Sequence, residues 1–208
     1  MPGPSAEPVL DPWLARLPVT VGPGRTHQHE FVLVLSMEFP PSTVVDLPGG
    51  RRPSGWQVAV RTDVAGGRVH AVAVALPEAP LLWYVELPEP GDAATTLVAF
   101  SDTRYAEGTV LDADTATVAG VTGSQQVAAL RWWPGTGLVH QVYVAAGHRR
   151  RGVGRKLGQA AFGIQAARRL PALHGDGRRT DLGEQWRAGL PDVVASRMAA
   201  RSEVMPPM

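Results

Sequence analysis

Short apolar runs separated by turn residues fill the first half of the chain. The runs are rich in β-branched and aromatic residues, as strands are: EFVLVLSMEF (30–39), WQVAVRT (56–62), RVHAVAVAL (68–76), LLWYVEL (81–87) and TTLVAFS (95–101). Proline, glycine and aspartate cluster between them. The pattern predicts a β-rich region over 27–101, with no visible repeat period. It follows a Pro- and Gly-rich arm at 1–26, in which Asp11 and Pro12 are predicted to begin one helical turn.

The second half predicts a hairpin followed by a long helix. VAALRWW (127–133) and LVHQVYV (138–144) flank the turn PGTG, and one of the adjacent residues Trp132 and Trp133 is expected in the core. Apolar residues recur at helical spacing over 155–170, and Pro171 ends that pattern. The remaining elements are predicted as follows: a weak strand in TATVAGV (115–121), a helix over 181–190 capped by Thr180, and one more helical turn in the tail 191–208.

Composition excludes several classes of function. The 208 residues fit one large domain or two small ones, and 20 basic against 19 acidic residues leave a net charge of +1. No global field therefore draws the protein to nucleic acid or to an anionic membrane. The absence of cysteine excludes disulfides and thiolate nucleophiles, and the pair His27 and His29 is too small for a metal site. With no membrane-spanning run and no signal peptide in the sequence, we expect a cytoplasmic protein.

The stretch GHRRRGVGRKLG (147–158) is the strongest candidate for chemistry. It lies between a predicted strand and the long helix, and the first turn of a helix exposes unpaired N–H groups at a positive dipole end. Glycines let an anion approach those groups, so Arg149, Gly152 and Gly154 outline a phosphate-binding turn. The alternatives are a solvated charged turn and a patch that binds nucleic-acid backbone, although the latter lacks interleaved aromatic residues.

Two segments resemble the GCN5-related N-acetyltransferases (GNAT). VYVAAGHRRRGVGRKLG (142–158) is similar to that family's strand, Arg/Gln-x-x-Gly-x-Gly/Ala turn and helix, with Arg149, Gly152 and Gly154 at the signature letters. LHGDGRRTDLGEQWRAGL (173–190) resembles a later segment with Thr-x-x-Gly-x-x-Trp. The likeness covers about 125–190. It implies an α/β (α+β) protein, with a GNAT-like mixed sheet and helices over 102–190 behind the β-rich region.

The resemblance also implies a donor, acetyl-CoA, and a reaction, acetyl transfer to a primary amine. The backbone of the turn would bind the donor pyrophosphate, and the amides near Val142 and Val144 would face the thioester carbonyl, where negative charge develops. The implied turn residues are Arg149, Arg150, Arg151, Gly152, Val153, Gly154 and Arg155.

The sequence departs from the family in two places. Many members carry, after the helix, a tyrosine that acts as the general acid. The tyrosines of this chain, Tyr84, Tyr105 and Tyr143, all precede the helix. The family's acceptor half, a strand with two helices, reads here as strands and loops. As general base we select His140, because imidazole exchanges protons near neutral pH and because His140 is expected to share a strand face with Val142 and Val144. The alternatives are Glu107 and Asp102 in the preceding loop. His140 also fits a half-buried strand histidine without chemistry.

A different class of function competes with the enzyme. The missing tyrosine and acceptor half, and the Pro-rich tails, also suit a non-catalytic structural protein, such as a virion or other multisubunit component with a degenerate GNAT-like fold. Such a protein would form a homo-oligomer or a larger assembly, and it would not bind acetyl-CoA.

Overall fold

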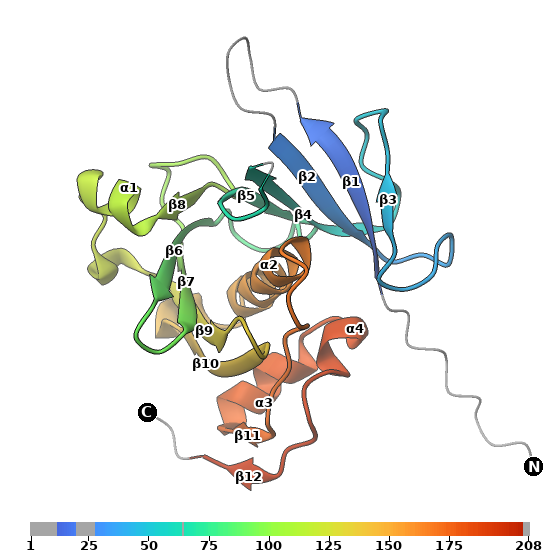
Figure 1. Ribbon diagram of the computed structural model, residues 1–208. Helices are drawn as coiled ribbons and strands as arrows, with labels where there is room; N and C mark the ends of the chain where they lie inside the picture. The colour runs from blue at the N-terminus through green and yellow to red at the C-terminus, as the bar shows by residue number, and fades with distance from the viewer. Residues whose placement is uncertain (1–11, 20–27, 64, 206–208) are drawn as a thin grey trace, which may run out of the picture.

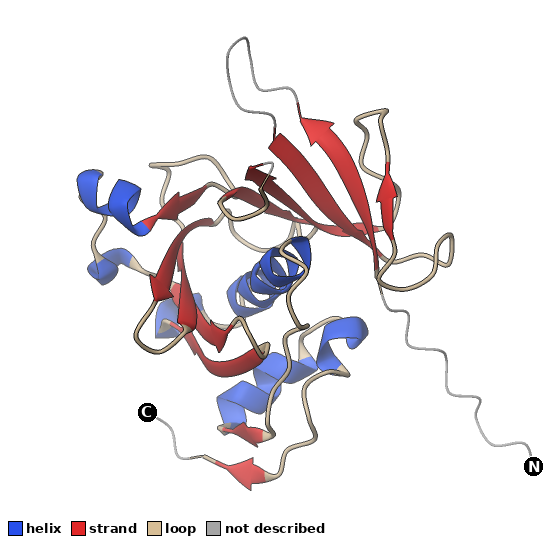
Figure 2. Cartoon of the chain, viewed as in Figure 1, coloured by secondary structure: helices blue, strands red, loops and turns tan. Residues whose placement is uncertain are grey.

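The computed structural model describes residues 12–19, 28–63 and 65–205. Two five-stranded sheets flank the long helix α2 (Val153–Ala167), as Figures 1 and 2 show. The N-terminal sheet contains β1 (Trp13–Val19), β2 (Gln28–Val34), β3 (Val44–Asp46), β4 (Trp56–Asp63) and β5 (Val69–Val74). The C-terminal sheet contains β6 (Trp83–Glu89), β7 (Ala94–Phe100), β8 (Val110–Asp112), β9 (Ala128–Trp133) and β10 (Leu138–Val144). This is the α+β architecture that the sequence predicts.

Shorter elements complete the chain. Among the described residues, the other helices are α1 (Ala113–Val118), α3 (Asp181–Ala188), α4 (Asp192–Ala195) and two 3₁₀ turns, η1 (Gly123–Gln125) and η2 (Ala146–His148). β11 (Arg178–Arg179) and β12 (Glu203–Val204) form a small parallel pair. The Thr180 hydroxyl caps α3 as predicted, by accepting from the Gly183 amide at 3.0 Å. The strand predicted in TATVAGV is wrong, because the Asp112 carboxylate accepts from the Thr115 amide at 2.7 Å and starts α1 there.

The helical turn predicted at Pro12 is also wrong. Residues 13–19 form β1, and Asp11 lies outside the described residues. Trp13, Ala15 and Leu17 pack into one apolar cluster, whereas Leu14 packs into the main core, so β1 buries apolar side chains on both faces. Antiparallel pairing stabilises β1 through backbone hydrogen bonds to β2, and the local sequence of residues 13–19 does not predict this pairing.

The two sheets repeat one topology, which corrects the expectation of no repeat. The strand order is β3-β1-β2-β4-β5 in one sheet and β8-β6-β7-β9-β10 in the other. In each sheet the first strand pairs in parallel with the third, and the other pairs are antiparallel. Each sheet also has a β-bulge in its last strand, at His70 in β5 and at His140 in β10. β6 and β7 lie within the predicted β-rich region 27–101, yet they hydrogen-bond into the C-terminal sheet.

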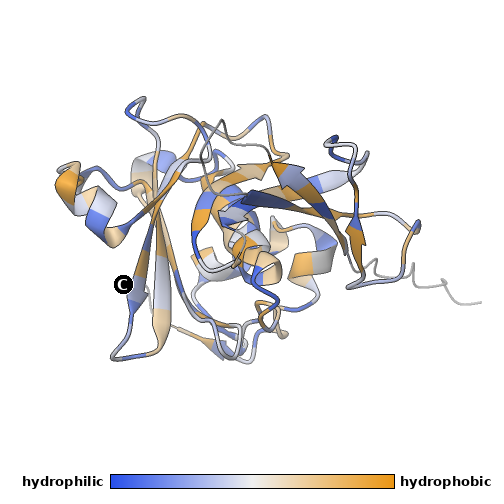
Figure 3. Ribbon diagram, turned by 45° about the horizontal axis from the view of Figure 1, so that its top comes forward, coloured by the Kyte–Doolittle hydropathy of each residue, from blue (hydrophilic) through white to orange (hydrophobic). Residues whose placement is uncertain are grey.

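The main core lies between the two sheets, around α2. Apolar residues run along the strands on both sides of this helix (Figure 3). Gly163 permits the close approach, because a Cβ there would lie 2.5 Å from Cγ1 of Val58. The core includes Leu33, Val58 and Val60 of the N-terminal sheet, Leu97, Leu130 and Trp132 of the C-terminal sheet, and Leu157, Ala161 and Ile164 of α2. The burial of Trp132 confirms the prediction for the tryptophan pair.

Candidate functional site

The turn before α2 has an unusual backbone. Arg150 and Gly152 have φ angles of 58° and 79°, in the left-handed region that non-glycine residues rarely adopt. A Cβ on Gly152 would lie 2.9 Å from Cβ of Ala79, so space as well as conformation requires glycine here. The sequence predicted this glycine for the approach of an anion. The structure adds a second reason, which is close packing against the segment that joins the two sheets.

The first turn of α2 has backbone N–H groups without an acceptor among the described residues. The Lys156 amide donates to the Gly152 carbonyl at 2.9 Å, but no described residue accepts a hydrogen bond of normal geometry from the amides of residues 152–155. Arg150 and Arg151 are exposed beside these amides. Free first-turn amides, a helix dipole and two arginines together favour an anion with several oxygens, such as a phosphate or diphosphate.

The strand that enters this turn has an open edge. β10 pairs with β9 on one side. On the other side, the backbone contact from the described residues is with His174 near the start of the strand, where Val139 N donates to the His174 carbonyl at 2.8 Å. Ala145 N donates across to Val127 of the β9 side at 2.9 Å. Because amides alternate along an antiparallel strand, those of Val142 and Val144 point to the open edge. The Val144 carbonyl on this edge accepts from Nε of Arg149 at 3.0 Å.

Trp186 of α3 borders the turn, a contact that the sequence did not predict. Its indole Nε1 donates to the Gly154 carbonyl at 2.8 Å. A Cβ on Gly154 would lie 3.0 Å from Cδ1 of Trp186 and 3.2 Å from Cγ2 of Val144, and one on Gly158 would lie 3.1 Å from Trp186. Two glycines one turn apart therefore allow an aromatic ring to pack on the helix. The spacing of these glycines, together with a tryptophan in the following helix, is the sequence signal that could have predicted the contact.

His140 lies on a different face from the one expected. The bulge after Val139 leaves Val139, Val142 and Val144 packed against the core, whereas the His140 ring is exposed and meets the Trp133 ring edge-on at 4.9 Å. The expectation that His140 shares a face with Val142 and Val144 is therefore wrong, because the extra residue of a bulge shifts the alternation.

An ion-pair network shares the outer face with His140. Arg131 lies 3.0 Å from Glu89, pairs with Asp92 as well, and stacks over the Trp133 ring at 5.3 Å. The hydrogen bonds from Arg131, the largest cause, hold the pKa of Glu89 below its usual value. This face of the hairpin therefore combines aromatic rings, an exposed imidazole and two carboxylates.

Glu107 pairs with a buried cation. It forms a short ion pair with Nζ of Lys156, a side chain that is only 3% exposed and that also donates to the Pro80 carbonyl at 3.1 Å. Tyr84 is fully buried nearby, its hydroxyl has no partner among the described residues, and burial raises its pKa. Lys156 is the single lysine of the chain, and no sequence pattern predicted a role for it. It joins α2 to the loop before β8 and to the segment between the sheets.

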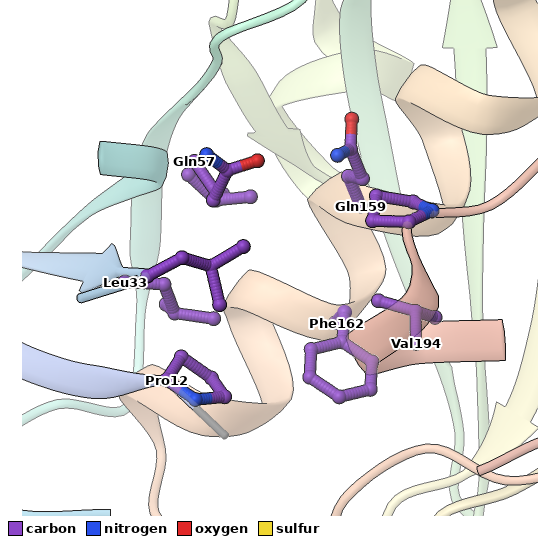
Figure 4. Close-up of a pocket in the computed structure, with 9 residues that line it drawn as sticks. Pro12, Leu33, Gln57, Gln159, Phe162 and Val194 are labelled. Atoms are coloured by element: carbon purple, nitrogen blue, oxygen red, sulfur yellow. The ribbon is translucent and has the colours of Figure 1, made fainter. Parts of the chain in front are cut away.

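A separate pocket lies between the N-terminal sheet, α2 and α4 (Figure 4). It measures about 320 Å³ with its open mouth, and apolar side chains form most of its wall. Gln159 is buried in this wall, and its Oε1 has no hydrogen-bond partner among the described residues. The lining residues are Pro12, Leu33, Leu35, Gln57, Val58, Gln159, Phe162, Pro191 and Val194.

The described residues offer neither a cluster of metal ligands nor a membrane-spanning helix. Within 12–19, 28–63 and 65–205, no three metal-ligating side chains gather, and His27 lies outside these ranges. In the same ranges no helix has the length and apolar character needed to cross a bilayer.

Within an α+β fold, a strand with an open edge, a glycine turn and a helix with free first-turn amides form a candidate site for a phosphate-bearing ligand. Residues 78–174 match the model of the acetyltransferase (GNAT) family, and this segment is a GNAT acetyltransferase domain, which supports acyltransferase activity. The match runs from the segment before β6 to His174, so it extends upstream of the resemblance at 125–190. Comparisons with curated proteins and with solved structures gave no significant match. None of these findings supports the assembly-protein alternative.

Proposed function

We propose that the C-terminal half transfers an acetyl group from acetyl-CoA to a primary amine. The observation that carries the proposal is the set of free amides at residues 152–155, next to the open edge of β10. The family match over 78–174 supports the same reaction class.

In this proposal the turn binds the donor diphosphate. The amides of Gly152, Val153, Gly154 and Arg155 donate to its oxygens, and the guanidinium groups of Arg150 and Arg151 add charge-assisted bonds. Arg149 acts through the backbone, since its Nε already donates to the Val144 carbonyl and holds the end of β10 against the turn. The donor's acyl arm lies along the open edge, where the amides of Val142 and Val144 point.

Acetyl transfer then needs one proton acceptor and one stabilised oxyanion. The amine nitrogen attacks the thioester carbonyl, the carbon–sulfur bond breaks, and the sulfur leaves as a thiolate that takes up a proton from water. A strand amide of β10 stabilises the negative charge on the carbonyl oxygen. His140, exposed at the bulge of the same strand, accepts the proton that the amine loses. Glu107 is paired with Lys156, so we assign it to positioning α2 rather than to proton transfer.

Calorimetric titration of the full chain with acetyl-CoA tests donor binding. We expect micromolar affinity, and a loss of about tenfold or more in Arg150→Glu/Arg151→Glu, because each tenfold corresponds to about 1.4 kcal/mol, roughly one charge-assisted bond. Arg51→Glu reverses the charge of one exposed loop arginine of the N-terminal sheet, half the charge change of the double variant, and should leave affinity unchanged. A wild-type protein that binds no acetyl-CoA at millimolar concentration contradicts the proposal.

Release of free coenzyme A thiol in the presence of a panel of small primary amines tests catalysis. His140→Ala should lower kcat by about a hundredfold while the donor dissociation constant stays the same, since loss of a general base affects the chemical step. His70→Ala, at the corresponding bulge of the N-terminal sheet, is the matched control and should retain full activity. Equal rates in the two variants would remove His140 from the mechanism.

A further inference from the structure

The two sheets correspond in sequence as well as in topology. Trp13 opens β1 and pairs with Val34, whereas Trp83 opens β6 and pairs with Phe100. The indole Nε1 of Trp13 donates to Ser36 at 2.8 Å, and that of Trp83 donates to Asp102 at 2.9 Å. Each acceptor lies two residues beyond the residue that pairs with its tryptophan. The same hydrogen bond therefore occurs at the same place in both sheets.

The last two strands of each sheet extend this correspondence. VRTDVAGGRVHAVAVA (60–75) and LRWWPGTGLVHQVYVA (130–145) align without a gap and share seven identical positions, among them the bulge histidines His70 and His140. Ala75 N donates to the Gln57 carbonyl at 2.9 Å, and Ala145 N donates to the Val127 carbonyl at 2.9 Å. Sequence, bulge and hydrogen bonds agree, so the sheets are two copies of one unit.

The two copies differ at the outer edge of their last strand, which is open in β10 of the second copy and covered in β5 of the first. Val142 N points to the free edge of β10, and the corresponding amide in the first copy is that of Val72. Val72 N donates to the Gly108 carbonyl at 2.7 Å, and Ala71 forms an antiparallel bridge with Thr109. The loop before β8 therefore covers the first copy's edge with its own backbone.

The first copy also lacks the anion-binding turn. In the alignment, Ala79 and Leu82 stand where the second copy has Arg149 and Gly152, and the chain runs directly into β6 without a helix. Instead of forming its own site, this segment packs on the other one, since Ala79 is the residue that Gly152 contacts.

Gly108 makes the closure possible. Its φ of 79° is left-handed, and a Cβ there would lie 2.5 Å from the Val72 carbonyl oxygen, so no other residue fits without displacement. Its own amide donates to the Leu82 carbonyl at 2.7 Å. The neighbouring Glu107 pairs with Lys156 of α2. One short loop thus connects the closed edge to the helix that carries the open site.

We infer that the N-terminal sheet is a second copy of the acyl-donor sheet whose donor edge is closed by the chain's own segment 107–109. Each chain then holds one donor, at β10, and the closed copy supports α2. The expectation of one bound donor per chain rests on the proposed function, whereas the closure of the β5 edge is independent of it.

Two measurements on the full chain test the inference. Titration with acetyl-CoA should give one donor per chain. Residue-resolved amide hydrogen exchange without donor should show a protected Val72 amide, and amides of Val142 and Val144 that exchange at least tenfold faster and slow when acetyl-CoA is added. Two donors per chain, or a Val72 amide that exchanges as fast as that of Val144, overturns the inference. No binding at all overturns the proposed function and the donor count, while the exchange rates still decide whether the edge is closed.

Gly108→Ala tests the closure directly. Gly120 also has a left-handed φ, of 65°, but nothing lies within 4 Å of an added Cβ there, so Gly120→Ala controls for backbone strain alone. We expect Val72 exchange to accelerate at least tenfold in Gly108→Ala relative to Gly120→Ala. Equal exchange in the two variants would show that the Gly108 contact does not close the edge.

Discussion

At the scale of single residues, two buried glutamines of α2 have opposite environments. Gln165 accepts from the indole of Trp132 at 3.0 Å and donates to the carbonyls of Pro134 and Pro171 at 2.6 and 2.8 Å. Gln159 is equally buried, but its Oε1 has no partner among the described residues. A buried acceptor that gives up water without gaining a partner destabilises the fold.

Leucine at each position should therefore have opposite effects on stability. Gln159→Leu removes the unpaired Oε1 and adds an apolar side chain to the pocket wall, so we expect the free energy of unfolding to rise by about 1 kcal/mol. Gln165→Leu leaves the Trp132 indole and two carbonyls without partners, so we expect a loss of about 1–3 kcal/mol. Denaturant titration monitored by circular dichroism measures both. A Gln159→Leu protein that is as destabilised as Gln165→Leu would mean that the Gln159 amide has a bound partner.

Single residues also show which features of the candidate site could be predicted from the sequence. The signature glycines were identified from their spacing, but the packing of Gly152 on Ala79 and of Gly154 on Trp186 comes from distant segments. Lys156 was overlooked because a lone lysine in a helix has no pattern. Its ion pair with Glu107 joins positions 49 residues apart.

At the scale of elements, the two corresponding tryptophan hydrogen bonds, one in each sheet, have acceptors of different charge. The acceptor in the N-terminal sheet is the Ser36 hydroxyl, which does not titrate, whereas the C-terminal sheet uses the Asp102 carboxylate. The hydrogen bond from Arg104 is the largest cause that lowers the pKa of Asp102 below its ordinary 3.8, and the Trp83 indole contributes. A lowered folded pKa means that the charged form stabilises the fold.

Asp102 should therefore make the protein acid-sensitive. Its contribution to stability is fully present above the unfolded pKa of 3.8 and is lost as pH falls through the lower folded pKa. Asp102→Asn keeps an acceptor for Trp83 but cannot titrate, so we expect its stability to fall less than that of the wild type between about pH 4 and pH 2. Chemical denaturation at a series of pH values measures the difference. Parallel pH profiles would exclude this carboxylate as a source of acid sensitivity.

The elements that the sequence predicted are those with a strong local signal. The hairpin of β9 and β10 follows from alternation and a proline–glycine turn, and α2 follows from its apolar periodicity. β3 and β8 were missed because each has three residues and pairs in parallel with a strand about thirty positions away. Their stability depends on partners that no local pattern reports.

At the scale of the whole molecule, one helix serves two sheets. Alignment of the two hairpins, β4–β5 and β9–β10, makes the repeat visible. The copies differ in the length of the loop before β4 and β9, and the first copy lacks a helix after its last strand. The repeat therefore has no constant period along the chain. Gly163 of α2 faces Val58 and Val60 of the first copy, while Trp132 of the second copy contacts the same helix through Gln165. The N-terminal sheet thus completes the core of the acetyltransferase domain.

Residues 78–208 expressed without the first copy should therefore lack a stable native core. The truncation exposes the α2 surface that Leu33, Val58 and Val60 cover, and each such apolar side chain contributes about 1.5–3 kcal/mol when buried. Several of them together approach the whole stability of a typical domain, about 5–15 kcal/mol. We expect this fragment to bind a hydrophobic dye and to lose the sharp thermal transition of the full chain, measured by dye fluorescence and near-ultraviolet circular dichroism. A fragment that unfolds at the temperature of the full chain would show that the GNAT domain is independent and that the first copy has no structural role in it.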